Sequence, residues 1–250
     1  IPSAGQWKGK ESETFLTQTG AHVSMDRWLE FLGYIITDGC VTSSTGSRIQ
    51  ITQNPGAKAN VIENCLKELP WQHTESHSNG ARVFSVHHQQ LKGEIASLIG
   101  TPEGVYGKQK HLPDFIWGLS PKHLLHLLNA VILGDGTRYD TLPNTTALVF
   151  RTTSPALADD VQRLAILCGY MTKHSQVITK SGYNPGISVF YVHISAGHPQ
   201  LLERKRITKI SYNGIVYCAT VPNGTLLTRF QGRTCISGNS TVVAQNPMIR

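Results

Sequence analysis

The sequence lacks the features that mark membrane, secreted or disordered proteins. Only 16% of its 250 residues are charged and 40% are hydrophobic, which is typical of a globular chain with ample core. No apolar run approaches the roughly 20 residues that a membrane helix needs. The first residues, IPSAGQWKGKESE, lack the basic-then-apolar order of a secretory signal. We therefore expect an intracellular protein, in the cytoplasm or in the nucleoid or nucleus, without a membrane partner.

Paired cysteines are also lacking. The five cysteines are scattered and no two of them form a CxxC pair, so neither a disulfide framework nor a zinc site is predicted. The eleven histidines include three close pairs, but no cysteine or carboxylate accompanies them at a zinc-site spacing. We expect these histidines to make hydrogen bonds at the surface, where some would face a ligand.

Acidic residues are scarce in particular segments. The net charge is +7, and residues 201–250 alone hold seven Lys or Arg against one acid. Within the body of the chain, the segments 40–62, 76–93, 136–158 and 171–199 hold one acid, Asp140, against eight bases: Arg48, Lys58, Arg82, Lys92, Arg138, Arg151, Lys173 and Lys180. Either this sorting arises by chance, or it predicts a basic sheet face and more acidic helices, which would suit a nucleic-acid partner.

An internal repeat is present. FLGYIITDG (31–39) is echoed by LNAVILGDG (128–136), which places Asp38 and Asp135 97 positions apart. Further along, Pro55 lies opposite Pro155, and VFSVH (83–87) opposite VFYVH (189–193). Three matches in the same order predict a duplicated unit of about 100 residues.

Each copy has the same predicted order of elements, which indicates an α/β (α+β) fold. An apolar helix ends at Asp-Gly, where Gly39 and Gly136 would adopt the left-handed conformation. An alternating strand follows, at 48–52 or 148–153, and then a helix with proline in its first turn, at 57–69 or 155–168. One or two strands (82–88; 175–179 and 187–194) and a closing helix (89–99; about 198–204) complete the unit.

Strand alternation separates two faces. Apolar residues such as Ile49, Ile51, Phe84 and Val192 would face the helices. The opposite face is polar and free of acids, a composition suited to reading base edges and phosphates. Its predicted DNA-binding residues are Arg48, Gln50, Thr52, Ser85, His87, Arg151, Thr153, Tyr191 and His193.

The two repeated segments resemble the paired motifs of LAGLIDADG homing endonucleases in their single-chain form. The resemblance implies two pseudo-symmetric subdomains whose motif helices pack together under saddle-like antiparallel sheets. Gly33 fits the close approach of these helices, and Ala130 stands where the second copy would have glycine. It also implies that Asp38 and Asp135 meet, hold Mg²⁺ and cut both strands of a long double-stranded DNA site, and that the protein acts as a monomer.

The chemistry gives a separate reason for two aspartates. Phosphodiester hydrolysis needs an oxygen-rich metal site that activates water and offsets charge on the leaving oxygen. KQKHLPDFIWGL (108–119) is similar to the family's linker block, which makes Lys110 the candidate catalytic cation and Lys108 a weaker one. A solvated loop lysine is the alternative.

The tail resembles the C-terminal splicing blocks of inteins through VYCATVP (216–222) and Gly238-Asn239-Ser240. The resemblance implies that Asn239 cyclises and that Ser240 is the acyl acceptor. The tail departs from the intein pattern at Cys218, where aspartate is frequent, and at Gly238, where histidine is usual. Residues 1–22 contain no N-terminal splicing block, so we expect a fragment that begins inside an intein and cannot splice alone.

These observations predict five segments: an N-terminal linker (1–22), LAGLIDADG subdomains at 23–110 and 111–203, a β-rich intein (Hint) remnant at 204–239, and the start of the host protein, the C-extein, at 240–250. The expected function is that of an intein-embedded, site-specific, Mg²⁺-dependent DNA endonuclease with host exteins as partners. Two alternatives stay open: a DNA-binding module of the same fold that has lost cleavage, and a splicing element with a vestigial nuclease.

Overall fold

The computed structural model describes residues 9–41, 48–100, 107–142, 145–180 and 185–196, and beyond these 208, 210–215, 217, 219, 221 and 224–238. The chain divides into two compact units, the body (Trp7–Ala196) and a second unit made of Ile1–Gln6 and Gly197–Arg250. Each is described by itself. The body ends at Ala196, seven residues before the predicted end of the second subdomain.

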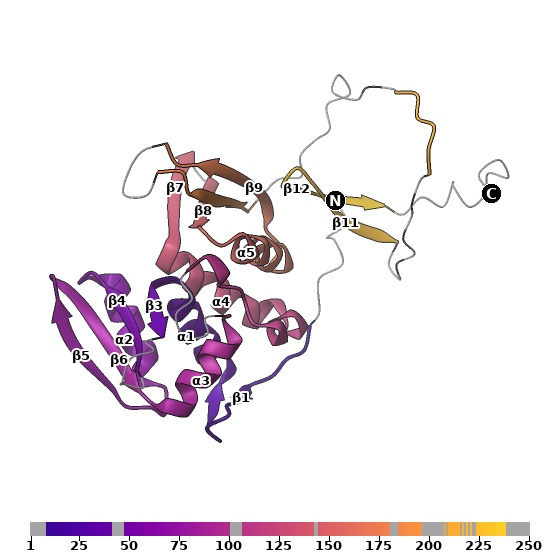
Figure 1. Ribbon diagram of the computed structural model, residues 1–250. Helices are drawn as coiled ribbons and strands as arrows, with labels where there is room; N and C mark the ends of the chain where they lie inside the picture. The colour runs from indigo at the N-terminus through magenta and orange to yellow at the C-terminus, as the bar shows by residue number, and fades with distance from the viewer. Residues whose placement is uncertain are drawn as a thin grey trace. The chain divides into compact units, whose positions relative to one another are not determined.

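The body contains two halves that share the order helix, two strands, helix, two strands (Figure 1). The first half comprises α1 (Met25–Asp38), β3 (Gly39–Val41), β4 (Arg48–Gln53), α2 (Ala57–Lys67), β5 (His73–Ser78), β6 (Ala81–His87) and α3 (Gln89–Leu98). The second half comprises α4 (Pro121–Asp135), β7 (Gly136–Leu142), β8 (Thr145–Thr152), α5 (Pro155–Leu167), β9 (Met171–Ile178) and β10 (Ser188–Ser195). A closing helix, α3, follows in the first half, whereas the one predicted at about 198–204 lies outside the described residues. Two short 3-10 helices, η1 (Gly107–Gln109) and η2 (Asp114–Gly118), connect the halves.

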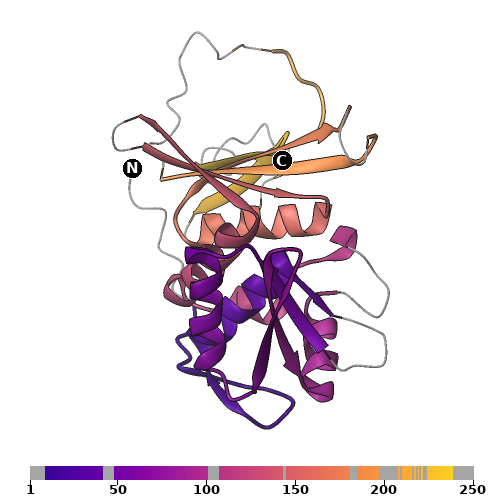
Figure 2. The ribbon, with the colours of Figure 1, turned by 90° about the vertical axis from the view of Figure 1, so that its left-hand side faces the viewer.

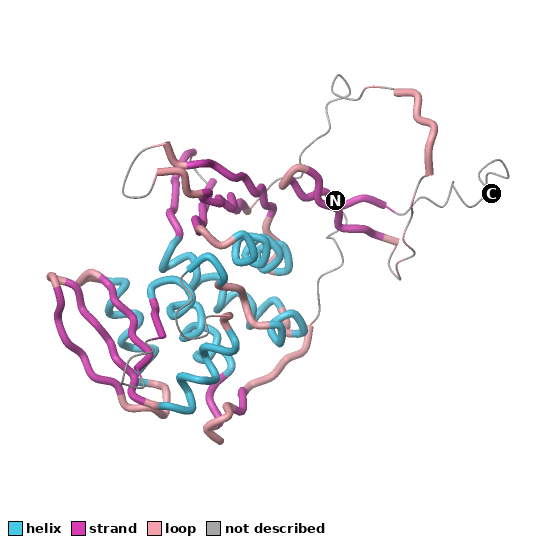
Figure 3. Tube along the Cα trace, in the orientation of Figure 1, coloured by secondary structure: helices cyan, strands magenta, loops and turns pink. Residues whose placement is uncertain are grey.

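The two sheets have one topology. The first sheet has the order β3-β4-β6-β5, and the body strands of the second have the equivalent order β7-β8-β10-β9. Every pairing is antiparallel. In Figures 1 and 3 the two groups of strands lie apart, and the helices of the body lie together beside them. The predicted duplication is therefore present in the fold.

Strand register corrects one detail of the repeat. Gly39 pairs with Ile51 and Ile51 with Phe84, whereas Gly136 pairs with Phe150 and Phe150 with Val192. Phe84 is thus equivalent to Val192, and both are at most 1% exposed. The likeness of VFSVH to VFYVH aligns Phe84 with Phe190 instead, which is wrong by two residues. A slip of two leaves every side chain on its correct face, so alternation could not detect it.

The helices α1 and α4 form the centre of the body and pack in parallel, in register. A Cβ at Gly33 would lie 2.5 Å from Ala130 Cβ, and one at Gly134 would lie 2.1 Å from Thr37 Oγ1. The members of each pair are 97 positions apart, as are Asp38 and Asp135, so each residue meets its own equivalent. This is what a twofold relation between the helices requires, and it brings the two Asp-Gly ends together.

The ends of α1 and α4 differ from the prediction. Gly39 (φ −96°, ψ 157°) and Gly136 (φ −92°, ψ 156°) are extended and not left-handed. The helix passes directly into a strand, and a Cβ at Gly39 would lie 2.5 Å from Ile35 Cα. Glycine is needed here for space rather than for a positive φ. Pro155 does begin α5 as predicted, whereas Pro55 lies two residues before α2, which begins after Gly56.

The described part of the predicted N-terminal linker is structured. β1 (Thr14–Leu16) pairs with β2 (His22–Ser24), which leads into α1. Phe15 stacks on Trp28 of α1 with ring centroids 5.1 Å apart, and Lys10 bridges to Leu119 beside the start of α4. This segment therefore packs on both halves.

The second unit has a described hairpin of β11 (Thr225–Phe230) and β12 (Arg233–Gly238). Its turn holds Gln231 and Gly232 at positive φ, so neither Asn-Gly pair of the tail forms this turn. In the described residues, no helix has the length and hydropathy needed to cross a membrane. The cysteines among them form no disulfide.

Candidate active site and nucleic-acid interface

Two carboxylates lie at the paired ends of the central helices. Asp38 is the last residue of α1 and Asp135 the last of α4. Burial, together with repulsion by the Asp135 carboxylate, raises the pKa of Asp38 to about 6. Burial likewise raises the pKa of Asp135. The negative ends of two helix dipoles add to this potential, so the site favours cations.

Lysines supply cations at this point. Lys110 Nζ donates hydrogen bonds to the carbonyls of Ile36 (2.7 Å) and of Thr37 and Gly39 (both 3.4 Å), at the end of α1. Lys58 Nζ, from α2, lies 3.5 Å from the Gly134 carbonyl, at the end of α4. Neither central helix has a basic residue in its own last turn. Lys58 of the first half thus caps α4 of the second half, and Lys110 of the connecting segment caps α1. Both lysines lower the pKa values of the two aspartates.

The segment that carries Lys110 is fixed by the second half. Ser154 Oγ donates to the Lys110 carbonyl (2.6 Å), and the Leu112 N–H donates to Asp160 of α5 (2.8 Å). Burial lowers the pKa of Lys110, an effect that Asp135 and Asp38 oppose. Lys110 therefore joins the end of α1 to the second half and stands beside both carboxylates.

Two participants were not predicted from the sequence. Gln53, the last residue of β4, donates through Nε2 to Asp38 Oδ2 (3.0 Å). Lys58 lies on the exposed side of α2. No local motif marks either residue. The signal that could have identified them is their place in the fold, because β4 ends and α2 begins next to the end of α1.

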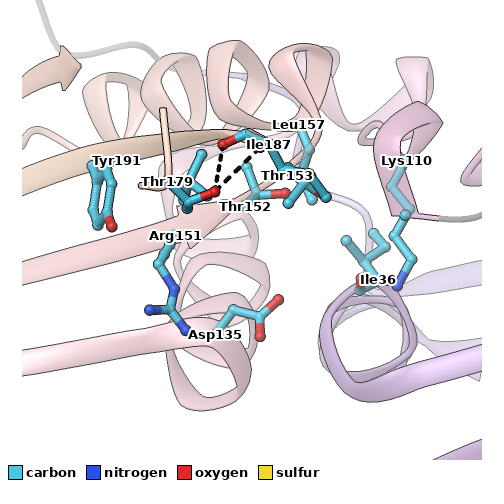
Figure 4. Close-up of a pocket in the computed structure, with 12 residues that line it drawn as sticks. Ile36, Lys110, Asp135, Arg151, Thr152, Thr153, Leu157, Thr179, Ile187 and Tyr191 are labelled. Carbon is cyan, nitrogen blue, oxygen red and sulfur yellow. Dashed lines mark hydrogen bonds between the residues drawn. The ribbon is translucent and has the colours of Figure 1, made fainter. Parts of the chain in front are cut away.

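A cavity of about 420 Å³ opens beside Asp135 (Figure 4). Arg151 extends toward Asp135 in this view, and its positive charge lowers the pKa of that carboxyl group. The side chain of Thr179 closes one wall through hydrogen bonds with Ile187. The cavity is lined by charged, hydroxyl and apolar groups: Ile36, Gly107, Lys110, Asp135, Arg151, Thr152, Thr153, Leu157, Thr179, Ile187, Val189 and Tyr191.

The predicted DNA-binding residues occupy two outer sheet faces. On the first sheet, register places Arg48 opposite His87 and Gln50 opposite Ser85, with Thr52 on the same face. On the second, Arg151 lies opposite Tyr191, and His193 follows on the same face. Thr153 lies just beyond β8 and, with Tyr191, lines the cavity. Ser85 is only 5% exposed and accepts a hydrogen bond from Gln50. It therefore positions the Gln50 side chain and is little accessible to DNA.

The expected basic face is smaller than the sequence indicated. Lys58 and Lys92 lie on helices, and Arg82 faces α2, where it pairs with Glu63 (2.6 Å) and Glu75 (2.7 Å). The acid-poor segments run past the strands into helices, and alternation along β6 turns Arg82 inward. Arg48, Arg151 and Lys173 remain on the outer faces.

Two histidines connect the halves, and His123, which is 3% exposed, is not on the surface where it was expected. His123 Nδ1 is 2.6 Å from Asp26 Oδ1, and its Nε2 accepts the Ser12 N–H (3.2 Å). His126 Nδ1 is 2.8 Å from Glu30 Oε1. These contacts join α1 to α4 at the end opposite the aspartates. His87 does lie on the first outer face.

The donor set fits a magnesium-type ion. Among the residues that the structure describes, no group of three or more His, Cys, Asp or Glu side chains could hold a metal. Mg²⁺ usually needs only one or two carboxylates and takes its other ligands from water and substrate phosphate. Asp38 and Asp135 would supply this pair. The predicted splicing residues Cys218, Asn239 and Ser240 lie outside the described residues.

Comparisons with known proteins give distant likenesses. No family model matches the sequence. A Clp protease proteolytic subunit from Chlamydomonas moewusii is 26% identical over 156 residues, which are 58% of this chain but 14% of that protein. The structure is similar to mesophilic variants of the homing endonuclease I-DmoI (TM-score 0.46, 14% identity, 69% of this chain and 89% of that one). Other similar structures are I-DmoI in complex with DNA and Mn (0.46, 15%, 68% and 89%) and the N-terminal LAGLIDADG domain of DUF199/WhiA (0.42, 11%, 67% and 75%). The chain's own elements give a mixed α/β fold with antiparallel sheets, and the comparisons report its likeness to LAGLIDADG domains.

Proposed function

We propose that this chain is a Mg²⁺-dependent endonuclease that binds a specific double-stranded DNA site as a monomer and cuts both strands. The observation that carries the proposal is the in-register pairing of α1 and α4. This pairing brings two like carboxylates together at the helix ends where β3 and β7, the first strands of two sheets of the same topology, begin. Repulsion between two such carboxylates destabilises the fold unless cations offset it, so the pair favours binding of a metal ion.

Each residue of the site has a distinct task. Asp38 and Asp135 would hold Mg²⁺, which when bound supplies a Lewis acid and lowers the pKa of water. Gln53 holds the Asp38 carboxylate in one orientation through its 3.0 Å hydrogen bond. Lys110 places a positive charge beside both carboxylates, where negative charge builds up on a phosphate during hydrolysis. Arg151 extends its charge from the outer sheet face to Asp135.

The outer faces supply the DNA contacts in this proposal. Two symmetric sheets beside a shared centre match the two strands and two half-sites of a duplex. Arginine and lysine on these faces would contact phosphate, and the remaining polar residues would reach base edges.

Cleavage of a plasmid that carries the target tests the proposal, with Mg²⁺ and with chelator. Asp38→Asn and Asp135→Asn should each lower double-strand cleavage more than 100-fold, because each removes a metal ligand. DNA affinity should stay similar or rise slightly, since a negative charge near phosphate is lost. Asp114→Asn is the matched control, because Asp114 is exposed at the start of η2. Full cleavage in chelator, or by the double Asn variant, would refute the mechanism. Tight binding without cleavage by the unmodified protein would favour the DNA-binding module that lacks nuclease activity.

We also propose that the chain derives from an intein, with residues 204–239 as the splicing remnant and 240–250 as host sequence. Two facts support this: the Asn239-Ser240 pair after the intein-like block, and the match to a short part of a much longer protein. Fusing an N-terminal splicing domain and a reporter ahead of Ile1 tests it. Ligated host sequence should form and should be lost in Asn239→Ala. Absence of both ligation and cleavage at Ser240 would count against splicing, without bearing on the nuclease.

A further inference from the structure

The two outer faces have different chemistry despite their common topology. The first outer face consists of Arg48, Gln50, Thr52, Thr74, Ser76, Ser85 and His87 with Val83 and Cys40, by register. Hydrogen bonds link its side chains, from Gln50 to Ser85 (3.1 Å) and between Thr74 and His87 (3.4 Å). Almost every position on this face therefore offers a hydrogen-bonding group.

The second outer face carries more aliphatic residues than the first, set among polar ones such as Thr137, Ser175 and Ser195. Register places Val177 opposite Val189, Val149 opposite His193, and Ala147 opposite both Tyr139 and Ser195. Val177 is 51% exposed and Tyr139 48%, and Val149 and Val189 are partly exposed. This face therefore offers apolar area that a partner could cover.

DNA is the occupant that the surroundings favour. Arg151 and Lys173 lie on the same face, and no carboxylate does among its described residues. The face is continuous with the cavity beside Asp135, because Val189, Tyr191 and Arg151 belong to both. A surface with basic residues around aliphatic ones suits a duplex major groove, in which the thymine C5-methyl is the apolar feature.

We propose that the second sheet recognises its half-site through thymine methyl groups, whereas the first sheet reads its half-site through hydrogen bonds. This inference rests on the proposed DNA-binding function and adds to it the composition of the target. Val149, Val177 and Val189 are the residues that contact the methyl groups. Arg151 and Lys173 bind the flanking phosphates.

Replacing thymine by deoxyuridine tests the proposal, because it removes only the methyl group. The full chain first selects its site from a randomised duplex pool without Mg²⁺, and hydroxyl-radical protection of Arg151→Ala then identifies the second sheet's half-site. Uracil in that half-site should weaken binding about fourfold for each contacted thymine. Uracil in the other half-site should change binding less than twofold.

Two protein variants sharpen the test. Val177→Thr keeps the branched shape and should reduce the sensitivity to uracil in the second half-site. Thr52→Val is the matched change on the first face and should leave that sensitivity unaltered. Equal sensitivity in the two half-sites, or a second half-site without thymine, would overturn the proposal while leaving DNA binding intact. Failure to select any duplex would overturn the proposed function itself. Self-association that Val177→Thr abolishes, with unchanged DNA affinity, would identify the face as an interface between copies and refute the proposal.

Discussion

The two halves of the body share a topology and differ wherever a ligand would touch them. Their cores use equivalent positions, such as Ile51 with Phe150 and Phe84 with Val192. Around the carboxylates, Gln53 donates to Asp38 in the first half, whereas Arg151 extends toward Asp135 in the second. Figure 2, which turns the left side of Figure 1 to the viewer, shows the sheets that carry these unlike faces. The two halves therefore keep one framework, and their residues differ in the core, at the helix contact and on the outer faces.

The largest predicted effect comes from removing the two lysines beside the carboxylates, Lys110 and Lys58, one at a time. Lys110→Met should lower the cleavage rate by about 100-fold, because it removes a half-buried cation from beside both carboxylates. Lys58→Met should lower it by about tenfold, since Lys58 is exposed and its charge is screened by solvent. Single-turnover cleavage measures both rates, and Lys108→Met, an exposed neighbour, is the control. Equal losses at both lysines would show that the halves are catalytically equivalent here.

A second prediction concerns the helix contact that joins the halves. Gly33→Ala places a Cβ 2.5 Å from Ala130 Cβ and should lower the free energy of unfolding by about 1 to 3 kcal/mol. Adding Ala130→Gly exchanges the two residues across the pseudo-twofold axis and should restore most of this loss. Urea denaturation measures each step. Gly93→Ala in α3 has open space and should stabilise instead, by about 0.5 to 1 kcal/mol. If the double variant were no more stable than Gly33→Ala, the in-register pairing would be contradicted.

The third prediction uses the raised pKa of Asp38. Because its folded pKa is about 6, above the ordinary 3.8, ionised Asp38 opposes folding at neutral pH. Asp38→Asn should therefore raise the unfolding free energy by about 1 to 2 kcal/mol at pH 7. The gain should fade as the pH falls from about 6 to 4, where Asp38 in the folded protein is already protonated. Thermal unfolding without metal across this range checks the sign, and a gain that grew at low pH would be incompatible with it. Cleavage should also fall below about pH 6, because protonation competes with metal.

The smallest predicted effect is on the salt dependence of DNA binding. Because Arg151 contacts a phosphate in the proposed complex, Arg151→Ala should reduce the slope of log K against log salt by about 0.9. If it reads a base instead, the slope should stay the same and specificity should relax at one position, at a cost of about 1 to 3 kcal/mol. Arg82→Ala is the comparison, because Arg82 is paired with Glu63 and Glu75 away from the outer face. A salt response that is flat in the unmodified protein would exclude the basic strands as the contact surface.

Local pattern predicted the elements whose sequence is periodic. Apolar spacing identified α1 and α4, and alternation identified β4, β8 and the core side of β6 and β10. β5 escaped prediction because His73–Ser78 carries no apolar residue, and its place in the sheet comes from pairing with β6. Gly39 matches a known signal for the C-terminus of a helix. Its actual role, to avoid a clash between a Cβ and Ile35, arises only because a strand follows directly.

The site followed the same rule. The repeat and the family resemblance predicted Asp38, Asp135 and Lys110, and the structure brings them together. Lys58 and Gln53 could not be predicted, because their roles depend on where separate elements end in space. His123 was misplaced for the same reason: its partner Asp26 lies 97 residues away and becomes a neighbour only through the helix pairing.

That pairing of histidine with aspartate also determines which halves can combine. Two copies of the first half, arranged like α1 and α4, would place Asp26 against Asp26 and Thr37 against Thr37. Two copies of the second would bring the Ala130 methyl groups into collision. Only the mixed pair matches acid with imidazole (2.6 Å) and glycine with a larger partner at both crossing points. The body, cut in the connection at 101–106 and produced as two polypeptides, should therefore reassemble as a heterodimer and not as either homodimer, which makes it a ready source of an orthogonal split protein.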